Sequence, residues 1–158
     1  MHARLRKLVG AALSAPAGTL SLLEQKFLMA ALLASIITAD DRIHPAELAH
    51  YAELLSDKLQ LPEGAIESMA DIISHGLSPE ELEMVCVATR KYISIEARVE
   101  LAKQLWGIAL SDGELHPKEK VYVHQIAGMI GVRGLRAFSD MWTEVSQMKS
   151  EGHNAQDL

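Results

Sequence analysis

The sequence predicts an all-α protein, a bundle of seven or eight helices that contains an internal repeat. Three observations support this fold class. No segment shows the alternation of apolar and polar residues that is typical of a half-buried strand. Aromatic residues make up only 4% of the 158 residues, so small aliphatic side chains must fill the interior, as suits close helix packing. In addition, one loop motif occurs twice at an offset of 72 residues, between apolar segments with helical spacing.

The composition is that of one globular domain, which we expect to span residues 1–150, with a flexible polar tail at 151–158. Hydrophobic residues make up 49% of the chain and charged residues 23%. The formal net charge is −6 and no stripe of Lys or Arg runs through the body of the chain, so a nucleic-acid partner is not expected. The single cysteine, Cys86, lies in an apolar run and is predicted to be a small buried side chain.

In the first half of the chain, a short helix over 3–14 is followed by a longer one. Ser21 and Glu24 form a capping-box pattern, which predicts a helix to about Thr38. Pro45 stands where a first helical residue belongs and opens a helix to about Leu59, and another helix runs from Pro62 to near Gly76. The side chains predicted to face inward are Phe27, Ala30, Leu33 and Ile37, then Leu48, Tyr51, Ala52, Leu55 and Leu59, then Ile66, Met69, Ile72 and Ile73.

In the second half, the run Ser78-Pro79-Glu80-Glu81 is a complete capping box and predicts a helix to about Tyr92. Ser94 caps a helix over 95–110, Pro117 opens one that Gly131 closes, and a last helix covers roughly 135–148. The predicted inward side chains are Leu82, Val85, Cys86 and Ala88, then Val99, Ala102, Leu105, Trp106 and Ala109, then Val121, Val123, His124, Ala127 and Ile130.

The repeated motif occupies residues 39–47 and 111–119. Each copy reads Asp, a turn residue, any residue, an aliphatic residue, His, Pro, any residue and Glu. The helices before the loops align as 27–39 with 99–111, and those after them as 45–59 with 117–130. This core repeat, within residues 20–132, predicts two helix–loop–helix units related by a pseudo-twofold axis.

One interpretation of the motif is purely structural. His44 and His116 are at the N-cap position, and Glu47 and Glu119 are the third helical residues, where a carboxylate can accept a hydrogen bond from the N-cap backbone and complement the helix dipole. Gly113 permits the positive φ that a helix C-terminus needs. In this interpretation each loop is a helix–helix corner.

The other interpretation is a metal site. The second half of a calcium-binding EF-hand loop has a similar pattern, in which an Asp is followed by Gly, then an aliphatic residue, and then a Glu seven residues after the Asp. The positions that should supply the first oxygen ligands are apolar or Thr, which excludes a standalone EF-hand. If the pseudo-twofold brings the loops together, they could pool ligands for Ca²⁺ or Mg²⁺, while the two histidines would favour Zn²⁺. The candidate ligands are Asp40, Asp41, Glu47, Asp112, Glu114 and Glu119, with His44 and His116.

An enzyme is the alternative function: a metal-dependent catalyst with a carboxylate and histidine centre between the repeats. Such an enzyme needs an open coordination position and a general acid or base nearby. The sequence carries no zinc-peptidase His-Glu-x-x-His, no phosphate-binding Gly-rich loop and no nucleophile elbow. We therefore expect a protein without catalytic activity and without a cofactor other than a divalent cation.

The doubled loop resembles the TerB-like family, which includes tellurite-resistance proteins and a domain at the front of a membrane-anchored DnaJ-type cochaperone. The resemblance covers about residues 20–132. The family pattern, Ala-Asp-Gly-x-(Ile/Val)-x-x-x-Glu, is matched by Ala39, Asp40, Ile43 and Glu47, and again by Asp112, Gly113, Leu115 and Glu119. The departures are Asp41 for the glycine, Ser111 for the alanine, and histidines where small polar caps are usual, at His44 and His116.

The resemblance implies an all-helical bacterial domain of the cytoplasm that is linked to tellurite and other chemical stress. It implies a binding or scaffold module that can associate with a metal and has no established catalysis. A protein partner, which could be membrane-associated, is expected. A homodimer through exposed apolar helix faces is a further possibility.

Overall fold

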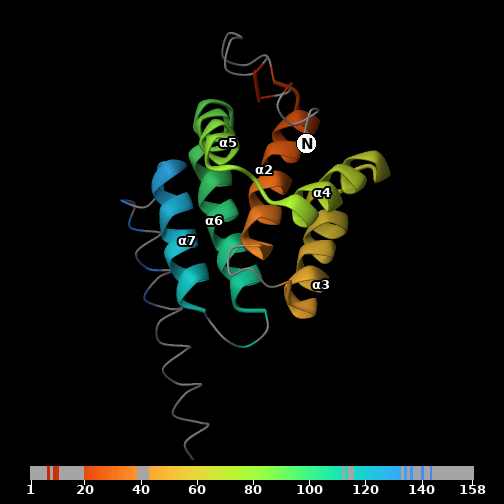
Figure 1. The fold of residues 1–158 in the computed structure, drawn as a ribbon. Helices are drawn as coiled ribbons and strands as arrows, with labels where there is room; N and C mark the ends of the chain where they lie inside the picture. The colour runs from red at the N-terminus through yellow and green to blue at the C-terminus, as the bar shows by residue number, and fades with distance from the viewer. Residues whose placement is uncertain are drawn as a thin grey trace, which may run out of the picture.

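The computed structural model describes residues 7, 9, 10, 20–38, 43–111, 113, 116–132, 134, 136, 140 and 143. Within these residues the chain forms six α-helices, one π-helix and no strand (Figure 1). The helices predicted at 3–14 and 135–148, and the tail, lie largely outside them. The elements are α2 (Leu22–Ile37), α3 (Pro45–Glu53), the π-helix η1 (Leu54–Leu59), α4 (Glu63–His75), α5 (Pro79–Tyr92), α6 (Ile95–Ala109) and α7 (Pro117–Met129).

The all-α class is confirmed, and serine caps set several helix starts. Ser21 before α2 and Ser78 before α5 each form a capping box with the glutamate three residues on. Ser94 accepts a hydrogen bond from the backbone of Ala97 at the start of α6. None of the helices in the described part of the chain combines the length and the continuous apolar character that crossing a membrane requires.

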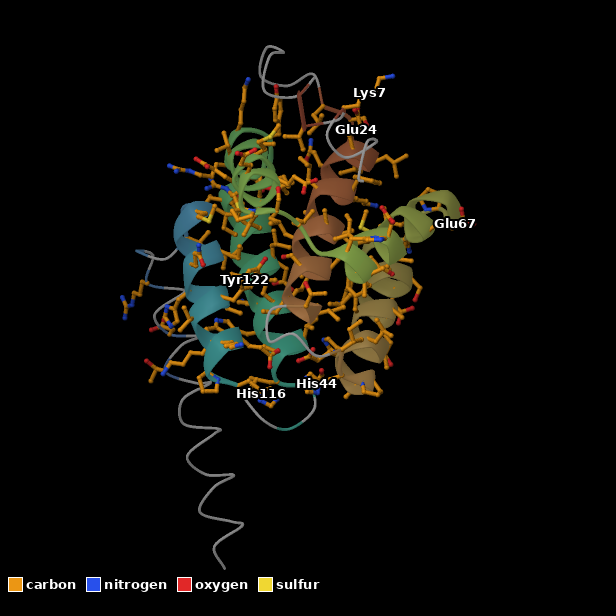
Figure 2. All side chains as sticks on the ribbon, in the orientation of Figure 1. Lys7, Glu24, His44, Glu67, His116 and Tyr122 are labelled. Atoms are coloured by element: carbon orange, nitrogen blue, oxygen red, sulfur yellow. The ribbon has the colours of Figure 1, made fainter. Side chains whose placement is uncertain are left out.

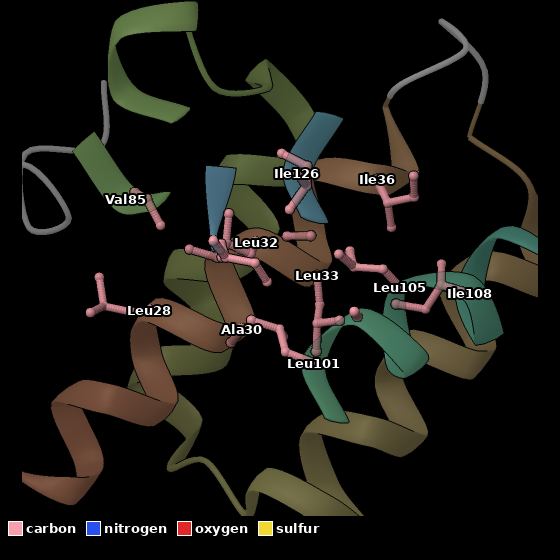
Figure 3. Packing of buried hydrophobic residues seen from close by; sticks show 14 of the residues in the cluster. Leu28, Ala30, Leu32, Leu33, Ile36, Val85, Leu101, Leu105, Ile108 and Ile126 are labelled. Atoms are coloured by element: carbon pink, nitrogen blue, oxygen red, sulfur yellow. The ribbon is translucent and has the colours of Figure 1, made fainter. Parts of the chain in front are cut away.

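Helix α2 is the centre of the fold, and it packs against α3, η1, α4, α5, α6 and α7. Its sequence explains this position, because a helix that is apolar on all sides is stable only when neighbours surround it. Figure 3 shows side chains of α2 meeting those of the other helices in the core. The fully buried residues there include Leu28, Leu32, Leu33 and Ile36 of α2, Leu101, Leu105 and Ile108 of α6, and Ile126 of α7.

Three predicted core residues are exposed. Val121 has 65% of its surface exposed, Leu48 has 39%, and Ala52 is also exposed. The cause is the register of the first turns, in which Glu47 and Glu119 take the inward position and are fully buried. Successive helical residues are about 100° apart, so Val121, two residues after Glu119, points away from the core.

The predicted helix from Pro45 to Leu59 is also interrupted. It is α-helical only to Glu53 and continues as the wider π-helix η1, which ends at Gln60 in the left-handed conformation (φ 51°). The Gln60 amide donates to the Leu55 carbonyl five residues earlier, as a π-turn requires. Leu54, Leu55 and Leu59 are all buried, so the π-helix keeps the apolar side chains of this segment in the core.

The helix boundaries of the repeated units coincide at the offset found in the sequence. Helix α2 ends at Ile37 and α6 at Ala109, while α3 begins at Pro45 and α7 at Pro117. The C-cap residues have similar conformations, with φ −99° and ψ 4° at Thr38 and φ −95° and ψ −2° at Leu110. A pseudo-twofold relation between the units, and a total of seven or eight helices, stay predictions.

Candidate functional site

The N-termini of α3 and α7 carry the described part of the repeated motif. Pro45 and Pro117 are the first helical residues, where the missing N–H of proline has no helical partner to lose. His44 and His116 are the N-cap residues, as predicted, and both have extended backbones. Unlike the serine caps of α2, α5 and α6, neither imidazole accepts a hydrogen bond from its own helix. The histidines therefore do not replace a serine in local capping.

The two imidazoles instead stack on each other. Their ring centroids are 5.0 Å apart and their planes differ by 12°, within the range of offset-stacked aromatic pairs. Figure 2 shows His44 and His116 side by side at one end of the bundle. Residues 72 positions apart, at equivalent places in the two copies of the motif, thus form one contact.

Glu47 and Glu119 lie just inside this histidine pair, in the first turns of α3 and α7. Both side chains are fully buried. In the second copy, His116 Nε2 lies 3.8 Å from Glu119 Oε1, and 29% of the His116 side chain is exposed. Buried carboxylates in proteins are paired with a cation, bound to a metal or protonated, because an isolated buried charge is strongly disfavoured.

The other four candidate ligands, Asp40, Asp41, Asp112 and Glu114, lie outside the described residues. In the part of the chain that the structure describes, no group of three or more His, Cys, Asp or Glu side chains could hold a metal ion. A metal site built from this motif therefore needs side chains of the two loops in addition to the histidines and buried glutamates. The pooling of carboxylates from both loops stays a prediction.

The single cysteine lies away from this site, in the core. Cys86 is buried, as predicted, and desolvation raises the pKa of its thiol to about 12. A thiol with this pKa holds almost no thiolate at neutral pH, and the thiolate is the form that attacks electrophiles and binds metals. Cys86 is thus a packing residue.

Sequence reasoning missed a cavity of about 810 Å³ beside the motif. Thr38 and Ile43, the described residues on either side of the first loop, both line it, as do Tyr122 and residues at the end of α4 and the start of α5. No spacing rule could have found this cavity, since it arises where the ends of separate helices meet the side of another.

A family model described as "Tellurite resistance protein TerB" matches residues 26–138, a range that includes both copies of the motif and all helices from α3 to α7. No curated protein and no solved structure matched the chain.

Proposed function

Because the chain belongs to the TerB family of tellurite resistance proteins, we propose that it is a non-enzymatic binding domain that holds a divalent cation between its two acidic loops. The observation that carries the proposal is the stacking of His44 on His116. This contact joins the residue that follows the first loop to the residue that follows the second, which supports the proposal that the two loops act together.

The donor set fits a hard cation. Six carboxylates, from Asp40, Asp41, Glu47, Asp112, Glu114 and Glu119, offer the oxygen ligands that Ca²⁺ and Mg²⁺ prefer. The histidine pair adds imidazole nitrogens, which would favour Zn²⁺ if they coordinated. A bound cation would also supply the positive charge that the buried Glu47 and Glu119 carboxylates favour in their ionised form. We expect the oxygen ligands to determine which ion binds, and we therefore expect Ca²⁺ or Mg²⁺ rather than Zn²⁺.

The biological setting that we propose is a scaffold of the tellurite and chemical stress response in the bacterial cytoplasm. The acidic net charge of −6 favours a protein partner with a basic surface over nucleic acid. A membrane-associated partner and a homodimer are both compatible with this role. Cation binding would regulate the partner by fixing the two loops in one arrangement.

Thermal melting in the presence of CaCl₂, MgCl₂ or ZnCl₂, after treatment with EDTA, tests the cation proposal. A ligand that binds only the folded state stabilises it by about 2.7 kcal/mol at a concentration of one hundred times Kd. For a chain of this length, each kcal/mol shifts Tm by roughly 2–4 °C, so we expect an increase of about 5–10 °C. The absence of a shift with all three ions would refute cation binding and leave the family assignment intact.

Two variants test whether the loops share one site. Asp40→Asn and Asp112→Asn, one in each loop, should each abolish most of the shift, and the double variant should lose little more than either single one. Asp57→Asn, at an exposed position in η1, is the control that removes one negative charge outside both copies of the motif. If only one loop variant matters, the cation is bound by one loop and the shared site is wrong.

A further inference from the structure

The cavity beside the motif lies where four helices meet. Its wall includes Thr38 after α2, Gly76 after α4, Pro79 at the start of α5 and Tyr122 of α7. Its volume of about 810 Å³ is in the range of small-molecule binding sites. The groups that line the cavity determine which class of ligand it can bind.

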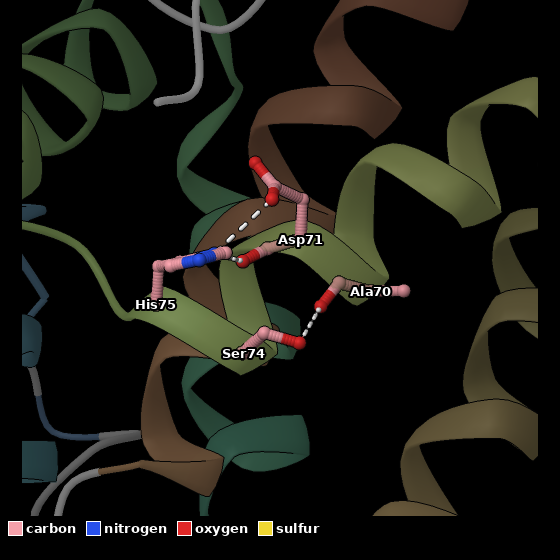
Figure 4. Close-up of polar contacts among 4 residues, drawn as sticks. All are labelled: Ala70, Asp71, Ser74 and His75. Carbon is pink, nitrogen blue, oxygen red and sulfur yellow. Dashed lines mark hydrogen bonds and ion pairs between the residues drawn. The ribbon is translucent and has the colours of Figure 1, made fainter.

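Three serine and threonine hydroxyl groups line the described part of the cavity, and each directs its hydrogen into its own helix. Ser35 Oγ donates to the Leu32 carbonyl at 2.6 Å, and Thr38 Oγ1 donates to the Ser35 carbonyl at 3.3 Å. Ser74 Oγ donates to the Ala70 carbonyl at 3.0 Å (Figure 4). A hydroxyl has one hydrogen and two lone pairs, so these three groups can offer a ligand only hydrogen-bond acceptors.

The ionisable groups of the wall add further acceptors. His75 Nδ1 lies 3.1 Å from both the carbonyl oxygen and Oδ1 of Asp71 (Figure 4). A neutral imidazole that donates from Nδ1 has an acceptor at Nε2. Glu83 contributes a carboxylate, and no Lys or Arg lines the cavity among the described residues. The wall is therefore rich in acceptors and negative in charge.

The helix dipoles at the cavity also favour a positively charged ligand. Helices α2 and α4 both end at the cavity, and the C-terminus of a helix carries a partial negative charge. The N-terminus of α5 has the opposite sign, but Glu80 and Glu81 in its first turn offset it. The net field of the backbone and side chains at the cavity thus favours a cation with several N–H donors.

The remaining described wall is uncharged and, apart from the amide of Gln125 and the phenol of Tyr122, apolar. Ile73, Leu82 and Met129 line it. Burial raises the pKa of the Tyr122 phenol well above its ordinary value, an effect larger than the lowering by a hydrogen bond with Ser35. Tyr122 is therefore uncharged at neutral pH, and its ring extends the apolar surface. An aliphatic chain fits such a surface.

We propose that this cavity binds a primary alkylammonium ion, with the ammonium group at the acceptors of α2, α4 and Glu83 and the methylene chain along the apolar wall. Two sources share this chemistry: free aliphatic di- and polyamines, and the lysine side chain of a peptide. The proposed amine binding requires no metal.

Isothermal titration calorimetry with the full chain tests this proposal. The probes are 1,5-diaminopentane and spermidine as free amines, N-acetyl-lysine methylamide as a lysine side chain, and 1,5-pentanediol as an uncharged analogue. Saturable binding of an amine, with none of the diol, would support the site, and the tighter class of amine identifies the source. If no amine binds, or the diol binds equally well, the proposal is overturned.

Matched variants locate the binding. Glu83→Gln should weaken amine binding about tenfold, because a charge-assisted hydrogen bond to the ammonium becomes a neutral one. Glu96→Gln, at an exposed position in the first turn of α6 and not part of the wall, should leave the affinity within about twofold, since exposed charges are screened. Equal weakening by both variants would show that the amine responds to the overall charge and would overturn the cavity site. Asp112→Asn should not change amine binding, which separates this result from the cation proposal.

Discussion

Replacing Gly131 by alanine should destabilise the protein far more than the same change at Gly113. Both glycines have a positive φ, 78° and 85° respectively, so alanine at either position enters the left-handed region at about 1–2 kcal/mol. A Cβ atom at Gly113 would meet no atom of the described residues within 4 Å, whereas one at Gly131 would lie 2.9 Å from Arg98 Nη1. Both substitutions therefore incur the cost of placing alanine at a positive φ, and only Gly131→Ala adds a steric contact with Arg98.

Arg98 cannot move away from that contact without loss. Its Nη1 donates to the Ile130 carbonyl at 2.6 Å and its Nε donates to the Ile93 carbonyl at 3.0 Å. From α6, Arg98 thus satisfies a carbonyl at the end of α7 and one just after α5. A hydrogen bond to a charged group contributes about 1.5–3 kcal/mol. Gly131→Ala should accordingly lower the free energy of unfolding by about 3–5 kcal/mol, against about 1–2 kcal/mol for Gly113→Ala.

Urea unfolding followed by circular dichroism at 222 nm measures both changes. The additional destabilisation of Gly131→Ala compared with Gly113→Ala should disappear in an Arg98→Met background, where the two alanine substitutions should lower the free energy of unfolding equally. Equal destabilisation by the two alanine variants in the wild-type background would refute the reasoning, because Arg98 would then have moved without losing its bonds. An excess that persists without Arg98 would assign the clash to another group, and Arg90 Nε, 3.4 Å from the added Cβ, is the next neighbour.

Two further predictions concern the histidine pair and the buried thiol. His116→Ala should lower the free energy of unfolding by about 0.5–1.5 kcal/mol through loss of the ring stack, and a double-mutant cycle with His44→Ala should show that the two effects are not additive; additive effects would contradict the stack. For Cys86, burial raises the pKa from about 9 to about 12, so its contribution to stability is complete below pH 9 and is lost as the pH rises through 12. The free energy of unfolding, measured with urea, should therefore decrease between pH 8 and pH 12, and Cys86→Ala should remove up to about 4 kcal/mol of this decrease. An equally large decrease in the Cys86→Ala variant would contradict an origin in the buried thiol.

Local chemistry explains which helix boundaries were predictable from the sequence. Ser21, Ser78 and Ser94 begin helices because a serine oxygen satisfies a backbone N–H that has no helical acceptor, and this chemistry needs only a few neighbouring residues. Pro45 and Pro117 begin helices because of their fixed φ. Such signals are independent of the tertiary fold and are therefore readable in the sequence.

Features that depend on packing were not readable. The inward positions of the first turns of α3 and α7 hold Glu47 and Glu119, although both sequences offer Leu48 or Val121 as more apolar choices. A hydrophobicity pattern assigns the apolar residue to the core by default, and only the contacts of the folded chain decide otherwise. The π-helix at Leu54–Leu59 left no recognisable signal either, since it adjusts the register of an otherwise ordinary helical sequence.

The positions where the chain departs from these local rules indicate where its function lies. At the N-cap positions of α2, α5 and α6 a serine side chain accepts a hydrogen bond from the helix backbone. At the N-cap positions of α3 and α7, in the two copies of the motif, a histidine is present and its side chain makes no capping hydrogen bond. The same two helix starts bury a carboxylate completely in place of an apolar residue. Natural sequences depart from local rules mainly at functional sites. Because both choices occur in both copies and the two histidines meet in one stack, the departures are concentrated at a single junction, which is where we place the cation.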